Sequence, residues 1–138
     1  MTVSLAIRSA YFERLNGNVE VDSRIVPVMD SFAPDEAIPP FIVLGTQTAV
    51  EQSSKTCRGY TVTITVDIVT RFLDPDGRYQ SELIAGQVED LISPDRWTDI
   101  QVQDYQVGDT TKEMDTDITS RAGNHYIYRK LLTYRHEI

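Results

Sequence analysis

Residues 60–71 constrain the fold more than any other part of this sequence. Apolar and hydrophilic side chains alternate there with a strict period of two: Tyr60, Val62, Ile64, Val66 and Ile68 are separated by Thr61, Thr63, Thr65 and Asp67. This period places the apolar side chains on one face of a β-strand and the hydroxyl and carboxylate groups on the other. At about 3.3 Å per residue, such a strand is roughly 40 Å long. A strand of that length with one apolar face needs other strands beside it and a helix or second sheet above it.

Two segments have the periodicity of helices that could cover this face. In residues 2–16, Val3, Ile7, Tyr11 and Leu15 recur every four positions and form one apolar stripe. Thr2 is a suitable N-cap, and a glycine at position 17 is a suitable stop. The second helix is predicted over residues 78–92, where apolar residues again recur at helical spacing before Pro94 prevents continuation.

The remaining apolar segments read as strands. Residues 18–32 look extended, with Pro27 indicating an edge strand or a break, and residues 41–50 form a strand with a possible bulge at Gly45. The polar segment that follows predicts an antiparallel hairpin with residues 60–72. Another strand is expected to begin near Ile100, and residues 125–138 are apolar on both faces, which predicts a strand inside the sheet or against a neighbouring subunit. The prediction is an α+β fold, an antiparallel sheet with two helices packed on one face, in a single domain over residues 1–138.

Residues 108–123 are predicted to be a long loop that binds a partner. Sixteen residues with only two large aliphatic side chains cannot compensate the roughly 1–2 kcal/mol per residue needed to order a backbone. We therefore expect order only against a neighbouring protein, with Met114 and Ile118 as apolar anchors. The polar rim of this contact would consist of Asp109, Glu113, Asp115 and Asp117. The alternative is a solvated hairpin tip without a partner.

No arrangement of residues in the sequence predicts an active site, a cofactor or a metal. His125 and His136 lie eleven positions apart on one strand and hence on opposite faces, and Cys57 near Lys55 and Arg58 has no base placed beside it. The acidic residues after position 108 fail the EF-hand spacing, because neither the glycine nor the closing glutamate is present. Trp97, the single tryptophan, is expected at the rim of the core.

Composition limits the classes of partner. The 138 residues carry a net charge of −8, which disfavours a protein that binds phosphate backbones through Lys and Arg. No run approaches the ~20 apolar residues of a membrane helix. One cysteine cannot form an internal disulfide, so the fold does not depend on an oxidising compartment.

One block of the sequence resembles the tail terminator or tail completion proteins of long-tailed bacteriophages. The block comprises the prolines and apolar strand of residues 39–45, residues 55–57 and the alternating strand, with a helix on either side. The resemblance implies a structural virion protein that forms a homo-oligomeric ring, usually of six copies, at the tail–neck junction after assembly in the host cytoplasm. Such a ring ends tube polymerisation and contacts the tail tube protein and the neck or connector proteins, while DNA passes through its channel without specific contacts. The alternatives are a head-completion or adaptor protein of the neck, a monomeric peptide-binding module and a small enzyme.

Overall fold

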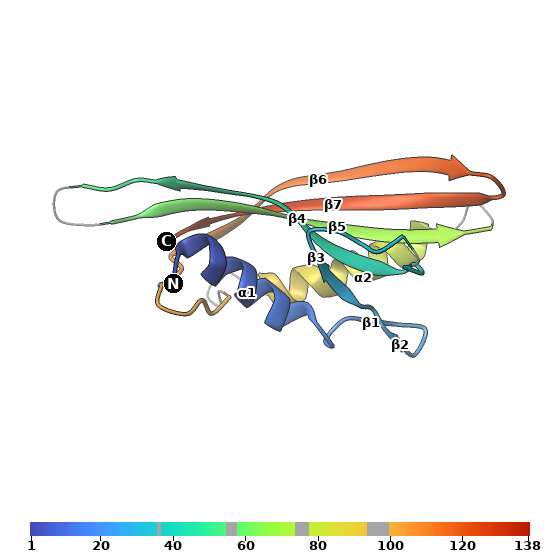
Figure 1. The fold of residues 1–138 in the computed structure, drawn as a ribbon, viewed down its shortest axis with the longest axis horizontal. Coiled ribbons are helices and arrows are strands. Elements are labelled where there is room, and N and C mark those ends of the chain that lie inside the picture. The colour runs from blue at the N-terminus through green and yellow to red at the C-terminus, as the bar shows by residue number, and fades with distance from the viewer. Residues whose placement is uncertain (36, 55–57, 74–77, 94–99) are drawn as a thin grey trace.

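In the computed structural model, which describes residues 1–35, 37–54, 58–73, 78–93 and 100–138, a long five-stranded sheet carries two helices on one side (Figure 1). The strand order in this sheet is β3-β4-β5-β7-β6, and β1 and β2 form a separate two-stranded ribbon. The elements in chain order are α1 (Val3–Leu15), β1 (Glu20–Val21), β2 (Arg24–Ile25), β3 (Val28–Asp30), β4 (Phe41–Glu51), β5 (Tyr60–Phe72), α2 (Arg78–Ile92), β6 (Asp109–Ala122) and β7 (His125–Glu137). The predicted α+β class is confirmed.

The central strand β5 has the facing that its alternation predicts. Val62, Ile64 and Val66 have no exposed surface and lie in the core with the buried residues of both helices. Thr63 and Thr65 are only partly buried, on the opposite face. Because β4 pairs with β5 on one side and β7 on the other, β5 is an interior strand along almost its whole length.

The predicted hairpin of β4 and β5 is present, and its strands are antiparallel. The register shifts by one residue between Leu44 and Gln47, so the bulge predicted at Gly45 is confirmed. One feature differs from an all-antiparallel sheet. β3 pairs with β4 in parallel, from Val28 with Ile42 to Asp30 with Leu44, which makes the sheet mixed. Pro27 directly precedes this short edge strand, a position where a missing N–H is tolerated.

Both predicted helices form at the expected positions. The Thr2 hydroxyl accepts a hydrogen bond from the Leu5 amide at 3.2 Å and caps α1. Gly17 follows the helix with a φ of 79°, in the left-handed region that glycine adopts without a Cβ clash. The stripe of Val3, Ile7, Tyr11 and Leu15 is buried, and so is the corresponding face of α2.

The loop predicted over residues 108–123 is wrong, because this segment is strand β6. β6 pairs with β7 along its length, and the two strands are joined by the two-residue turn Gly123-Asn124. Gly123 has a φ of 61°, as the first turn residue of a tight hairpin often requires. Few apolar residues suffice in β6, because an edge strand needs few buried side chains when its neighbour, β7, already belongs to the core.

The strand predicted to begin near Ile100 is also wrong. Only an isolated bridge between Val102 and Tyr105 is formed there. Ile100 and Val102 nevertheless pack into the core, which explains their apolar character without a strand. Cys57 and Trp97, which were discussed from the sequence, lie outside the described residues.

Candidate partner-binding surfaces

The residues predicted to bind a partner all lie on β6, but they belong to two faces of the sheet. Asp115 lies opposite Leu132 and Asp117 opposite Lys130, on the face that the helices cover. Met114 and Ile118 alternate with them and point to the other face, where they are 56% and 42% exposed. The structure therefore does not gather the predicted residues into one cluster of anchors and rim.

On the helix side, Asp115 and Asp117 belong to an ion-pair network around Lys130. Only 4% of Lys130 is exposed, and its ammonium lies 2.8 Å from Asp115 and 2.9 Å from Glu82 of α2. Asp117 lies 3.4 Å from the same ammonium and 2.8 Å from Arg78, the first residue of α2. These contacts tie the edge strand to the helix. They also mean that two of the predicted partner-binding carboxylates are already engaged within the chain.

The electrostatics of this network favour the charged forms of its members. Burial of Lys130 disfavours its charge, but hydrogen bonds to Asp115 and Glu82 outweigh that effect and raise the pKa of Lys130 above its ordinary value. Burial likewise acts to raise the pKa of Asp115, but hydrogen bonds from Lys130 and Lys112 lower it overall. A hydrogen bond to Glu89 of α2 raises the pKa of Lys112. β6 is therefore attached to α2 through Lys112 as well as through Lys130.

The face of the sheet away from the helices has a different chemistry. Threonine hydroxyls pair across its strands, Thr48 with Thr63 and Thr65 with Thr133. Among the predicted residues, Glu113 pairs with Arg135 at 3.2 Å, and Asp109 lies opposite Glu137 at the start of the strand. Met114 and Ile118 are the large apolar side chains that β6 exposes on this face.

The two histidines do not share a site, as predicted. His136 is fully buried on the helix side, where its Nε2 is within hydrogen-bonding distance of the Tyr11 hydroxyl and its Nδ1 lies 2.9 Å from the Thr110 hydroxyl. His125 is the first residue of β7, at the far end of that strand. The His136 contacts join α1, β7 and β6 across the core, so this side chain has a structural position.

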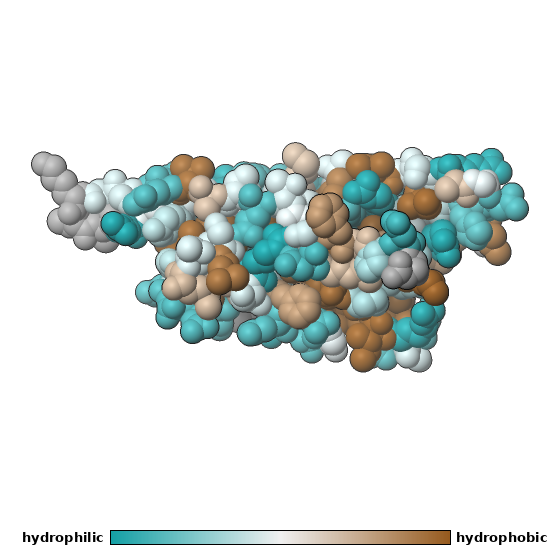
Figure 2. All heavy atoms as spheres, viewed as in Figure 1, coloured by the Kyte–Doolittle hydropathy of each residue, from teal (hydrophilic) through white to brown (hydrophobic). Residues whose placement is uncertain are grey.

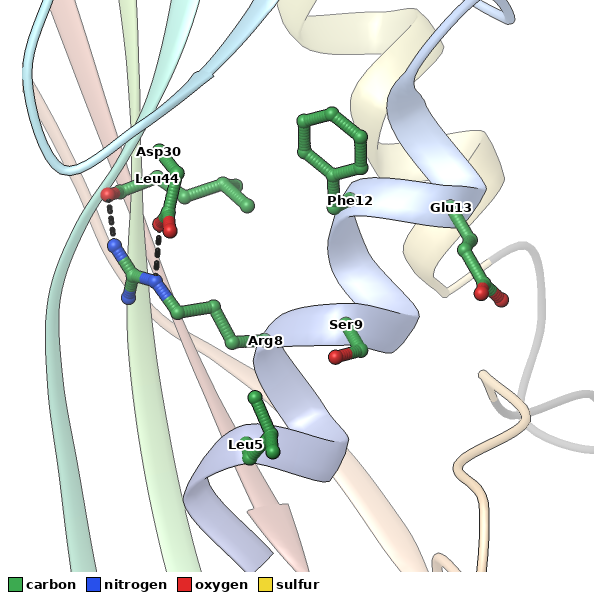
Figure 3. Close-up of a pocket in the computed structure, with 7 residues that line it drawn as sticks. All are labelled: Leu5, Arg8, Ser9, Phe12, Glu13, Asp30 and Leu44. Atoms are coloured by element: carbon green, nitrogen blue, oxygen red, sulfur yellow. Dashed lines mark hydrogen bonds and ion pairs between the residues drawn. The ribbon is translucent and has the colours of Figure 1, made fainter.

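A groove beside α1 was not predicted from the sequence. It has a volume of about 400 Å³, and Leu5 and Phe12 of α1 line it together with Leu44 of β4 (Figure 3). Arg8 reaches from α1 towards Asp30 and the Leu44 carbonyl and pairs with both (Figure 3). Its guanidinium also donates to the Gly45 carbonyl and to the Gln47 side chain, each at 3.1 Å. Arg8 thus ties α1 to the bulged part of β4, where the Leu44 carbonyl also accepts the Ser31 amide at 3.1 Å.

Hydrophobic surface on the side shown in Figure 2 occurs in separate patches among hydrophilic residues. Leu5, Phe12, Ile25 and Phe32 are among the exposed large apolar side chains of the N-terminal segment. Within the part of the chain that the structure describes, no three His, Cys, Asp or Glu side chains are grouped to hold a metal. Neither described helix combines the length and the hydrophobicity needed to cross a membrane.

The fold is similar to that of a chain in a solved structure described as the virion of a native gene transfer agent particle. The TM-score is 0.71 and the identity 14%, and the alignment covers 99% of this chain and 98% of the other. The class defined by this fold is a small α+β protein with a mixed five-stranded sheet.

The sequence itself gives the family. Residues 9–126 match the family of the tail completion protein gp17, and the chain belongs to that family, as the resemblance over most of residues 1–95 predicted. No match was found among curated proteins.

Proposed function

We propose that this chain is a structural protein of a bacteriophage virion that caps the tail tube as a ring, ends its polymerisation and joins the tail to the neck. The family match over residues 9–126 carries this proposal. The fold shared with a chain of a virion particle supports it. After assembly in the host cytoplasm, the protein would lie at the tail–neck junction. Its partners would be other copies of itself, most simply six in all, the tail tube protein and a connector protein.

The charge of the chain fits such a position. A ring around a DNA channel must let phosphates pass without holding them, and an excess of carboxylates withholds favourable phosphate contacts. With a net charge of −8, the chain carries that excess. Double-stranded DNA would then be a passenger with no specific site.

Met114 and Ile118, with Glu113 and Asp109 on the same face, are the side chains that we propose for contact with the tube or neck. They are exposed on the helix-free face, in contrast to Asp115 and Asp117, which are engaged with Lys130 and Arg78. An exposed apolar pair with a polar surround suits an interface that forms between two folded proteins.

Sedimentation of the purified protein followed by negative-stain imaging tests the ring. A closed ring will have a sedimentation mass several times the 15.7 kDa of one chain, and images of it will show a central hole. Addition to polymerising tail tube protein should then stop growth and leave a ring at one end of each tube. A protein that stays monomeric at micromolar concentration and does not respond to tube protein refutes the proposal. Rings that bind only the connector on filled heads would favour the head-completion alternative.

The double variant Met114→Ser, Ile118→Ser tests the contact face. It should form rings but attach poorly to tubes or connectors, with Thr116→Ser on the same strand as the control. Attachment equal to that of the unmodified protein would exclude these side chains from the contact.

A further inference from the structure

Part of β4 is an open edge of the sheet. β3 pairs only with residues 42–44 of β4, and on the side away from β5 no described strand pairs with residues 46–51. Thr46, Thr48, Ala49, Val50 and Glu51 are all exposed. The other edge of the sheet is the outer side of β6.

The hydrogen-bond pattern identifies the backbone groups that this edge offers. The Gln52 amide donates to the Gly59 carbonyl at 2.6 Å, whereas Tyr60 exchanges both of its bonds with Ile138, each at 2.9 Å. Because bonded and non-bonded pairs alternate in an antiparallel ladder, Thr48 and Val50 bond towards β5. The N–H and C=O groups of Gln47, Ala49 and Glu51 therefore point outwards.

This edge lacks the features that normally protect an exposed strand. Residues 47–50 contain no charged side chain and no proline, and the bulge between Leu44 and Gln47 lies before them. Thr46, Thr48 and Val50 are β-branched, which favours an extended conformation. Val50 is 55% exposed although it is a large aliphatic residue. An unprotected edge of this kind is expected to be covered in the functional assembly.

β6 is suited to cover it, although it is rich in charged residues. Four of these charges already have partners within the chain: Lys112 pairs with Glu89, Glu113 with Arg135, Asp115 with Lys130 and Asp117 with Arg78. A strand beside β6 would therefore meet side chains whose charges are largely neutralised. The same alternation along β7 leaves the backbone groups of Asp115 and Asp117 pointing outwards, since Met114 and Ile118 bond towards Thr133 and Arg129.

Strand direction makes the two edges compatible. From β4 through β5 and β7 to β6, each strand is antiparallel to the next, so β4 and β6 run in opposite directions. A second copy in the same orientation would thus bring its β6 antiparallel to β4. We propose that residues 46–51 of each subunit pair with β6 of a neighbouring copy. This contact is heterologous, as ring closure requires, and the proposal rests on the ring assembly proposed above.

Ala49→Pro tests the pairing, with Ala49→Thr as the matched control. Proline removes an outward N–H and places its ring on the open edge, while the ladder to β5 keeps its donors. The proline variant should keep the circular dichroism and unfolding transition of the parent yet sediment as a monomer. The threonine variant keeps the N–H and should assemble as the parent does. Rings of normal size from the proline variant overturn the pairing and leave the ring intact, whereas a parent protein that never assembles refutes both.

Hydrogen exchange at single-residue resolution gives a second test without any substitution. In the assembled parent, the amides of Gln47, Ala49 and Glu51 should exchange as slowly as those of Thr48 and Val50, which bond within the subunit. Exchange at Gln47, Ala49 and Glu51 more than about tenfold faster than at Thr48 and Val50 shows an open edge and overturns the proposal. This exchange experiment tests the pairing even if the proline variant fails to fold.

Discussion

Replacing Ile64 by alanine tests the facing of the central strand, on which the rest of the fold depends. The change removes three carbons from a side chain that has no exposed surface. At about 0.8 kcal/mol per buried carbon, the transfer term is roughly 2.4 kcal/mol. The cavity adds to this, because β5 is held between β4 and β7 and cannot collapse into the space. The expected loss in the free energy of unfolding is about 3–4 kcal/mol.

Thr63→Ala is the matched control, one residue away on the opposite face. Thr63 is partly exposed, and among the described residues its hydroxyl bonds to that of Thr48. Its loss should cost less than about 1 kcal/mol, since a hydroxyl left near solvent can bind water. Urea unfolding followed by circular dichroism measures the free energy of unfolding of both variants. In a thermal melt, the melting temperature should fall by roughly 10 °C for Ile64→Ala and by much less for Thr63→Ala. Equal losses for the two variants would show that the facing argument is wrong.

Two further predictions concern the Lys130 network. Lys130→Ala should lower the free energy of unfolding by about 1–3 kcal/mol at pH 7, because it leaves Asp115 and Glu82 without their cation. Lys130→Met should lower the free energy of unfolding by less. Urea unfolding measures both variants, and equal losses of stability would contradict this reasoning. The lowered pKa of Asp115 contributes stability that is present above its ordinary value of 3.8 and is lost as pH falls through the lower, folded-state pKa. Asp115→Asn should accordingly show a shallower loss of stability on acidification below about pH 4, and an unchanged pH profile would exclude this contribution.

The sequence predicted correctly those elements in which the spacing of apolar residues marks the face that is buried. The alternation of residues 60–71 and the four-residue stripe of α1 each specify a face, and both faces are buried in the structure. β7 is apolar on both faces and lies inside the sheet, which is one of the two locations predicted for it.

β6 was not predicted as a strand because its extended conformation is stabilised by pairing with β7. Its backbone pairs with β7 on one side, and its charges pair with Lys130, Arg78 and Arg135, all distant in sequence. One local signal was available: a Gly-Asn pair between two extended segments is typical of a tight hairpin. The parallel pairing of β3, three residues long, carries no comparable signal.

The burial of Lys130, but not its ion-pair partners, could be predicted from the sequence. It stands between Tyr128 and Leu132 in the alternation of β7, which places it on the buried face. A buried lysine requires anions, but nothing local indicates that they come from β6 and α2. The same limit applies to Arg8, whose acceptors on β3 and β4 are distant from it in sequence.

The extra residue of the bulge in β4 bears on how the length of this strand can vary. Before the bulge the even-numbered Ile42 and Leu44 are opposite core residues of β5, and after it the odd-numbered Gln47 and Ala49 are. Removing the extra residue between Leu44 and Gln47 would restore strict alternation and keep both faces, whereas losing one residue elsewhere in β4 would exchange the two faces on one side of the deletion. Related chains can therefore lack the bulge residue without losing the facing of β4, whereas elsewhere in this strand their lengths should differ by even numbers of residues.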